Sequence, residues 1–330
     1  MRLENFLALT QASLINKPCI NSFENIVFEA AKVKRGDLFF AYYANDIETA
    51  VKNGAYGIVF DGKVEVSDTE IAWIKTTNLD TALKRLLRFK MIEKEVSAFT
   101  CNEIVLKLSL QVEAQNNLIV LHGDLISIFK SLWGIEDRSI VLFCPSITDK
   151  DIFASVKKIP LPSSSSIMIV EQTLFETSFI YNDIFYERQL LCPFFIPYLE
   201  ELLHFYKALK INYRLKKFTP IEHFEAVFIN KKFEIKSFGT SDKVLIFEPN
   251  IDLIESQVVF LERYAPWADM IFLTPKNSSF QERKNLFNYK SQKEIIDILK
   301  NSSFHFALIA GVTKSILDKP LSNQTQLTME

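Results

Sequence analysis

The sequence predicts an α/β protein in three consecutive parts: a small N-terminal α/β domain over residues 1–94, a reduced central domain over 95–241 and a doubly wound C-terminal α/β domain over 242–330. Two observations support this prediction. Apolar strand-like runs alternate with amphipathic helix-like runs within 17–94, and the same alternation returns within 242–311. Alternation of this kind is typical of parallel sheets that carry helices on their faces.

The N-terminal part shows the alternation most clearly. Gly36-Asp37 predicts a turn before a strand-like run, and residues 46–62 predict a short helix followed by a strand. Residues 71–89 repeat the pattern with a strand and then a helix, for which Thr77 or Asn78 is the predicted N-cap. The buried stripe of that helix is predicted to consist of Leu79, Leu83, Leu86 and Leu87.

The later parts alternate more loosely. Period-two alternation over 223–238 predicts a hairpin that turns at 230–232. The most regular amphipathic helix is predicted over 197–211, with a proline in its first turn. Further strands are predicted over 139–145, 166–171, 242–250, 268–275 and 305–311.

Composition excludes several classes of protein. The formal net charge of −2 argues against a nucleic-acid partner, because such proteins carry a basic surface. The longest apolar stretch, 190–199, holds two prolines and is far shorter than the roughly 20 residues of a membrane span. The N-terminal 15 residues read as a short amphipathic helix and not as a secretory signal. Four cysteines without a Cys-x-x-Cys pair fit a reducing cytoplasm.

Three positions could carry chemistry of their own. His223 and Glu225 share one face of a predicted strand, which allows a metal site or an acid–base pair, but a surface hairpin fits better because no further His/Cys cluster accompanies them. Asp124, in His122-Gly123-Asp124, is predicted to be a helix N-cap, with a loop that carries a catalytic His122 as the alternative. Cys101 is predicted to be a buried, inert thiol, with a lowered pKa near a helix N-terminus as the alternative. We predict no catalytic residue and no metal site.

The first 90 residues resemble the N-terminal domain of the Mur ligases, the ATP-dependent amide ligases of bacterial cell-wall (peptidoglycan) synthesis. The resemblance rests on Asn21-Ser22-Phe23, on residues 35–41 and on Asn53-Gly54-Ala55 followed by a strand. It is closest to the enzymes that add the third residue or the D-Ala-D-Ala dipeptide. It implies weak substrate binding by Asn21, Ser22, Gly36, Asp37, Asn45 and Asp46, although an Asp, an Arg and an Asp-Gly-His of the family pattern are replaced here.

The family pattern next places a strand before a phosphate-binding loop, Thr-Gly-x-Asn-Gly-Lys-Thr-Thr. Here the strand ends at Thr100, and the degenerate loop Thr100, Cys101, Asn102 and Glu103 leads to Ile104, Val105 and Leu106. A phosphate loop needs glycines that expose backbone amides, a lysine and a hydroxyl that holds Mg²⁺. None of these stands at the matching positions, and the whole chain has only 8 glycines.

The resemblance therefore implies a Mur-ligase-like protein that has lost its phosphate loop. We expect a cytoplasmic, non-catalytic pseudo-ligase that binds a UDP-N-acetylmuramoyl peptide or a peptidoglycan-synthesis enzyme, without a cofactor. One alternative is an active, divergent acid–amino-acid ligase, which would need ATP and Mg²⁺. Another alternative is an interaction scaffold without a ligand.

Overall fold

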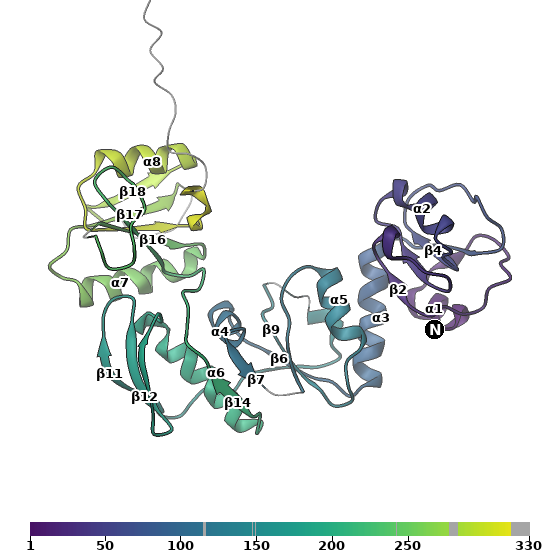
Figure 1. Ribbon diagram of the computed structural model, residues 1–330, viewed down its shortest axis with the longest axis horizontal. Helices are drawn as coiled ribbons and strands as arrows, with labels where there is room; N and C mark the ends of the chain where they lie inside the picture. Colours follow the sequence, from purple (N-terminus) through teal and green to yellow (C-terminus); the bar gives the residue numbers. More distant parts are fainter. Residues whose placement is uncertain (115–116, 147, 149, 242, 277–282, 318–330) are drawn as a thin grey trace, which may run out of the picture. The chain divides into compact units, whose positions relative to one another are not determined.

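The computed structural model describes residues 1–114, 117–146, 148, 150–241, 243–276 and 283–317 (Figure 1). This part of the chain forms two compact units. The first contains Met1–Leu106 and Ala114–Ile159, and the second contains Lys107–Glu113 and the chain from Pro160 onwards. Helices together with parallel and mixed sheets confirm the predicted α/β class. The three-part division of the sequence stays a prediction.

The first unit begins with a five-stranded sheet in the order β1-β5-β4-β3-β2. Strands β2 to β5 are parallel, and β1 pairs with β5 in the antiparallel direction. The strands are β1 Ser13–Leu14, β2 Ile26–Val27, β3 Leu38–Phe40, β4 Gly57–Phe60 and β5 Ala72–Lys75. The helices are α1 Leu3–Thr10, α2 Ile47–Lys52 and α3 Leu79–Glu93, with 3-10 turns η1 Ala30–Lys32 and η2 Ala44–Asp46.

Local sequence explains these elements. Gly36 has φ +100° in the turn directly before β3, a conformation that favours glycine, so the predicted turn is confirmed. Asn78 is the N-cap of α3, since its side chain accepts a hydrogen bond from Thr81 N at 2.8 Å. The predicted stripe of α3 is buried throughout.

The second sheet of this unit is fully parallel, in the order β10-β6-β9-β8. Side chains of α3, such as Leu86, pack in one core with Ile74 of the first sheet and with Val141 and Phe143 of the second. The elements are β6 Ser97–Thr100, α4 Glu103–Ser109, β8 Leu118–Val120, α5 Leu125–Trp133, β9 Ile140–Phe143, η3 Lys150–Ile152 and β10 Val156–Lys158. Asp124 caps α5 as predicted, accepting from Ser127 N at 2.8 Å.

The second unit opens with an antiparallel three-stranded sheet, β11-β12-β13, and the amphipathic helix α6. These elements are β11 Met168–Gln172, β12 Thr177–Tyr181, β13 Ile184–Gln189, the 3-10 turn η4 Pro193–Phe195 and α6 Ile196–Ala208. A small sheet pairs β7 Val112–Ala114 with β14 Tyr213–Leu215.

The unit ends in a five-stranded sheet in the order β15-β16-β19-β17-β18, of which four strands are parallel. Helices α7 and α8 cover opposite faces of it (Figure 1). The elements are β15 Glu225–Ile229, β16 Lys243–Glu248, η5 Ile251–Leu253, α7 Ile254–Tyr264, β17 Met270–Pro275, β18 Leu286–Tyr289, α8 Gln292–Asn301, β19 Phe306–Ala310 and η6 Lys314–Leu317.

The hairpin predicted over 223–238 forms only close to its predicted turn. A turn does form at Asn230, whose side chain accepts from Lys232 N and Glu234 N. Across the turn, Asn230 N donates to Glu234 O at 3.0 Å and Lys236 N donates to Phe228 O at 2.8 Å, on either side of an isolated bridge between Ile229 and Ile235. The longer ladder of β15 is with β16, which pairs with it along its whole length.

An aromatic cluster joins the three-stranded sheet to the five-stranded sheet within the second unit. The ring of Phe175, in the β11–β12 turn, lies 6.0 Å from Phe224, 5.8 Å from Phe228 and 6.3 Å from Phe306, measured between centroids. Aromatic pairs at such distances add to the stabilisation from buried area. The two sheets therefore share one packed interior.

Candidate functional site

The connection between β6 and α4 is the position of the degenerate phosphate loop. It consists of Cys101 and Asn102 alone, because α4 already begins at Glu103. The Asn102 side chain accepts a hydrogen bond from Val105 N at 2.9 Å, so one of the first amides of the helix is used internally. The Thr100 hydroxyl donates to Lys157 O at 3.3 Å.

Apolar side chains occupy the positions that the family pattern gives to glycine, lysine and threonine. Ile104, Val105 and Leu106 are 2%, 0% and 1% exposed. The residues present therefore do not fit the phosphates of a nucleotide, since they offer neither a cation nor a hydroxyl there. Cys101 is buried, as predicted, and its Sγ lies 3.7 Å from Phe143 O.

The six substrate-binding residues implied by the resemblance fall into two groups, which lie at opposite ends of the strands of the first sheet. Gly36 and Asp37 lie at the amino end of β3, where Glu24 N, two residues after Ser22, donates to Gly36 O at 2.9 Å. Asn21 adjoins Ser22, and its carbonyl accepts from Leu3 N. Asn45 and Asp46 form part of η2, after the carboxyl end of β3.

Asp37 has a structural role in its turn. Its carboxylate is buried and accepts from Asn25 Nδ2 at 2.9 Å and from Lys34 N at 2.8 Å. Ser22 and Asn21 are exposed, and Ser22 forms a bridge with Arg2 of the N-terminal segment. Of Asp37, Ser22 and Asn21, the last two are thus the residues that a ligand can reach.

A hollow of about 340 Å³ is lined by Phe23, the residue after Ser22, and by Arg2, which forms the bridge with Ser22. Residues 23–26, which follow Ser22, form one side of it, and α1, α3 and α5 supply the others. Trp133 and Phe89 give it aromatic walls, and Arg2 and Lys90 give it cations. Lys90 Nζ also lies 2.9 Å from a Glu93 carboxylate oxygen on the same helix.

Sequence reasoning missed the α3 and α5 side of this hollow. The signal was present in Phe89, an aromatic residue that lies off the buried stripe of its helix and is 47% exposed. Trp133 stacks on Phe129 with 4.7 Å between ring centroids, which fixes its indole at the hollow.

At the carboxyl ends of these strands, the polar side chains form hydrogen bonds within the fold. The Tyr42 hydroxyl donates to Asp80 Oδ1 at 2.7 Å, and burial together with this acid raises the pKa of Tyr42. Asp61 accepts from Leu79 N at the start of α3. Asn45 and Asp46 therefore lie beside structural caps and not beside Ser22.

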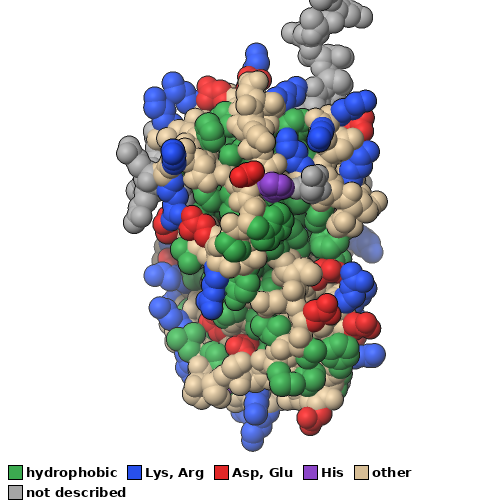
Figure 2. Space-filling model, turned by 90° about the vertical axis from the view of Figure 1, so that its left-hand side faces the viewer, with side chains coloured by type: hydrophobic (Ala, Val, Ile, Leu, Met, Phe, Trp, Pro, Cys, Tyr) green, Lys and Arg blue, Asp and Glu red, His purple; other side chains and the backbone are tan. Residues whose placement is uncertain are grey.

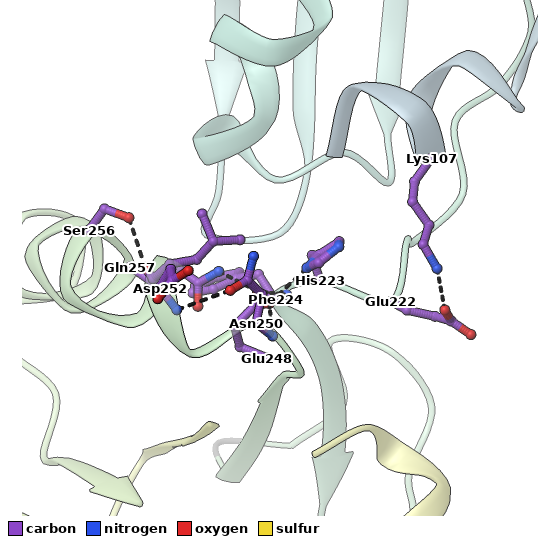
Figure 3. A network of polar contacts seen from close by, with 10 residues as sticks. Lys107, Glu222, His223, Phe224, Glu248, Asn250, Asp252, Ser256 and Gln257 are labelled. Carbon is purple, nitrogen blue, oxygen red and sulfur yellow. Dashed lines mark hydrogen bonds and ion pairs between the residues drawn. The ribbon is translucent and has the colours of Figure 1, made fainter. Parts of the chain in front are cut away.

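A buried polar network at the carboxyl end of β16 was not predicted (Figure 3). Glu248 is fully buried, and its Oε1 accepts from His223 Nδ1 at 2.7 Å and from Asn250 N at 2.9 Å. Its Oε2 accepts from Phe224 N at 3.1 Å and from Gln257 Nε2 at 2.5 Å. Four donors saturate this carboxylate, so it acts as a clamp between β16, α7 and the segment before β15.

The network corrects the surface hairpin predicted for His223. His223 is 1% exposed, because the chain before β15 turns inward over the end of β16 instead of forming an outer hairpin arm. Glu225 faces a different partner, Lys314 Nζ at 2.7 Å. Within the described residues, no group of three His, Cys, Asp or Glu side chains is placed to hold a metal ion.

Comparison with solved structures identifies the architecture. MurF from Acinetobacter baumannii superimposes with a TM-score of 0.54, at 9% identity, over 94% of this chain and 95% of that chain. The MurF ligase from Thermotoga maritima, solved in complex with ADP, gives 0.53 at 10% identity over 89% and 95%. The fold is that of the Mur ligases.

Sequence comparison adds no closer relative. No protein-family model matches the chain. No curated protein matches it either. The likeness to Mur ligases therefore concerns the fold, which confirms the architecture expected from residues 1–94. In the described part of the chain, no helix is long and apolar enough to cross a membrane.

Proposed function

We propose that this protein is a non-catalytic relative of the Mur ligases that acts in peptidoglycan precursor synthesis, in the bacterial cytoplasm, by binding a UDP-N-acetylmuramoyl peptide. The observation that carries the proposal is the two-residue β6–α4 connection with Val105 and Leu106 buried behind it. Without a lysine and a Mg²⁺-binding hydroxyl, the main electrostatic stabilisation of phosphoryl transfer is missing, which raises the barrier by several kcal/mol.

The first experiment measures ATP hydrolysis. Phosphate release is followed with Mg²⁺, with and without a UDP-N-acetylmuramoyl peptide and an amino-acid or dipeptide acceptor, beside an active Mur ligase as positive control. We expect no release above background. Mg²⁺-dependent release that disappears in the Glu103→Gln variant would favour the active-ligase alternative.

The hollow beside Ser22 is the proposed precursor site. Its aromatic walls suit the uracil ring, and Arg2 and Lys90 suit a diphosphate. The family contacts replaced here by Asn21 and Phe23 are charge-assisted bonds worth about 1.5–3 kcal/mol each. We therefore expect a Kd in the micromolar to millimolar range.

The second experiment is a calorimetric or NMR titration with UDP-N-acetylmuramoyl peptide. Ser22→Ala and Trp133→Ala are expected to weaken binding, whereas Asp46→Asn at the opposite edge of the same sheet serves as the matched control. If only Asp46→Asn weakens binding, the precursor site lies at the carboxyl end of β3 and the proposed site near Ser22 is wrong.

A second candidate function, binding of a peptidoglycan-synthesis enzyme, is favoured by one surface. The strand register aligns Met168, Ile180 and Phe185 across the three-stranded sheet, and Met168 and Phe185 are 59% and 53% exposed. Figure 2 shows hydrophobic side chains between charged ones on the side of the molecule where β11 and α7 lie in Figure 1. Exposed apolar surface of this kind marks protein contacts. A pull-down with a peptidoglycan-synthesis enzyme tests this candidate, and the Phe185→Ser variant is expected to capture less of that enzyme than the parent protein.

A further inference from the structure

Two cysteines lie side by side at the carboxyl ends of β6 and β9. The parallel register pairs Thr100 with Phe143, and Cys101 N donates to Phe143 O at 3.0 Å, so the ladder continues past the last registered pair. Cys101 and Cys144 are the next residues on the two strands. Neighbouring strands lie about 4.8 Å apart, and a disulfide spans Cα atoms about 4.4–6.8 Å apart.

Both side chains point to the same face of the sheet. Side chains alternate along a strand, so Cys101 shares a face with Phe99, and Cys144 shares it with Leu142. Val141 and Phe143 lie on the other face, in the core that α3 also enters. The Cys101 thiol lies 3.7 Å from Phe143 O, the carbonyl that directly precedes Cys144. The first thiol therefore leans toward the strand that carries the second.

The pair is close to the protein surface. Both cysteines are reduced and are 7% and 5% exposed. The residues that follow them, Asn102 and Pro145, are exposed. The Cys144 thiol also lies 3.0 Å from the hydroxyl of the exposed Ser146.

The other two cysteines lack this arrangement. Cys19 is exposed in the N-terminal segment. Cys192 is buried in the second unit, which contains no other cysteine to pair with it.

We propose that Cys101 and Cys144 form a reversible dithiol–disulfide pair that a peroxide oxidises. One thiolate attacks the peroxide, the O–O bond breaks, and a sulfenic acid and one water form. The second thiolate attacks the sulfenic sulfur, the S–O bond breaks, and the disulfide and a second water form. In total, two thiols lose two electrons and two protons to one hydrogen peroxide. An external dithiol reverses the reaction by exchange.

The disulfide ties the start of α4 to the chain that leaves β9. The carboxyl ends of parallel strands are the edge at which α/β proteins bind ligands. Oxidation therefore constrains this edge, at the position where the family pattern has its phosphate loop. This proposal does not depend on the proposed precursor binding.

The experiment uses the full chain with Cys19→Ser, which removes the exposed thiol. The protein is treated with hydrogen peroxide, blocked with N-ethylmaleimide and analysed by intact mass and tryptic mapping. We expect two fewer blocked thiols and a cross-link between peptides 95–107 and 139–150, reversed by dithiothreitol.

Three further variants decide the assignment. Adding Cys192→Ser is expected to preserve the cross-link, whereas adding Cys101→Ser or Cys144→Ser is expected to abolish it. The peptide map of the parent protein needs no change at the pair, so it remains decisive if those variants fold poorly. A cross-link to Cys192, a sulfinic acid without a cross-link, or full blocking of all thiols after peroxide would overturn the proposal.

Discussion

His223 donates its Nδ1 proton to Glu248 across 2.7 Å, and both side chains are fully buried. Removing one partner of such a pair leaves an uncompensated polar group in the interior. Glu248→Ala is therefore expected to lower the free energy of unfolding by about 3–5 kcal/mol, measured by urea titration. Glu222→Ala is the matched control, because Glu222 pairs with Lys107 at the surface and such pairs contribute about 0–1 kcal/mol. Equal effects of the two variants would contradict the clamp.

Restoring the lysine of the phosphate loop is expected to destabilise the protein and not to restore ATP binding. Val105→Lys places a cation at a position that is 0% exposed, so we expect a loss of roughly 3 kcal/mol or more of stability. Urea unfolding and ATP titration by calorimetry measure the two consequences. Glu103→Lys, at a half-buried position of the same helix, controls for the added charge. A Val105→Lys protein of unchanged stability that binds ATP would show that the loop is not part of the core.

Acid stability should depend on the cap of α5. Hydrogen bonds from Ser127 to the Asp124 carboxylate lower the pKa of Asp124 below its usual 3.8. A carboxyl group with a lowered folded-state pKa stabilises the protein above its unfolded pKa and loses this contribution as the pH falls through the folded value. The stability difference between the parent and Asp124→Ala should thus be full at pH 6 and vanish at strongly acidic pH. A difference that grows on acidification would contradict this assignment.

Cutting the chain at the predicted boundary of 241/242 should leave an incompletely folded product. The fragment 1–241 keeps Phe175 and Phe224 but loses Phe306 and Glu248, which pack against them. We expect it to bind a hydrophobic dye and to lose hydrogen-exchange protection in 160–241, while the first sheet keeps its protection. Full protection of 160–241 in the fragment would support an independent domain that ends at 241.

Local pattern predicted much of the fold because the relevant forces act within short segments. The α3 stripe, the Asn78 and Asp124 caps and the Gly36 turn follow from side chains a few residues apart. The Glu248 clamp was missed because His223 lies 25 residues away, and no spacing rule connects the two.

Only part of the candidate site could be predicted from the sequence, because its residues come from segments that lie far apart in the chain. The pairing of β2 with β3 brings Gly36 beside Glu24, two residues after Ser22, whereas Asn45 follows the carboxyl end of β3. Trp133 lines the hollow and belongs to α5, a helix that the resemblance did not link to the site. Only the folded chain brings these segments together.

The Phe175 ring, in the β11–β12 turn, contacts aromatic rings on both β15 and β19. This arrangement has a mechanical consequence. A force applied to the β11–β12 hairpin is transmitted through edge-on rings to the middle of the C-terminal sheet. A partner that binds this hairpin therefore applies any force to the C-terminal sheet as well as to the hairpin.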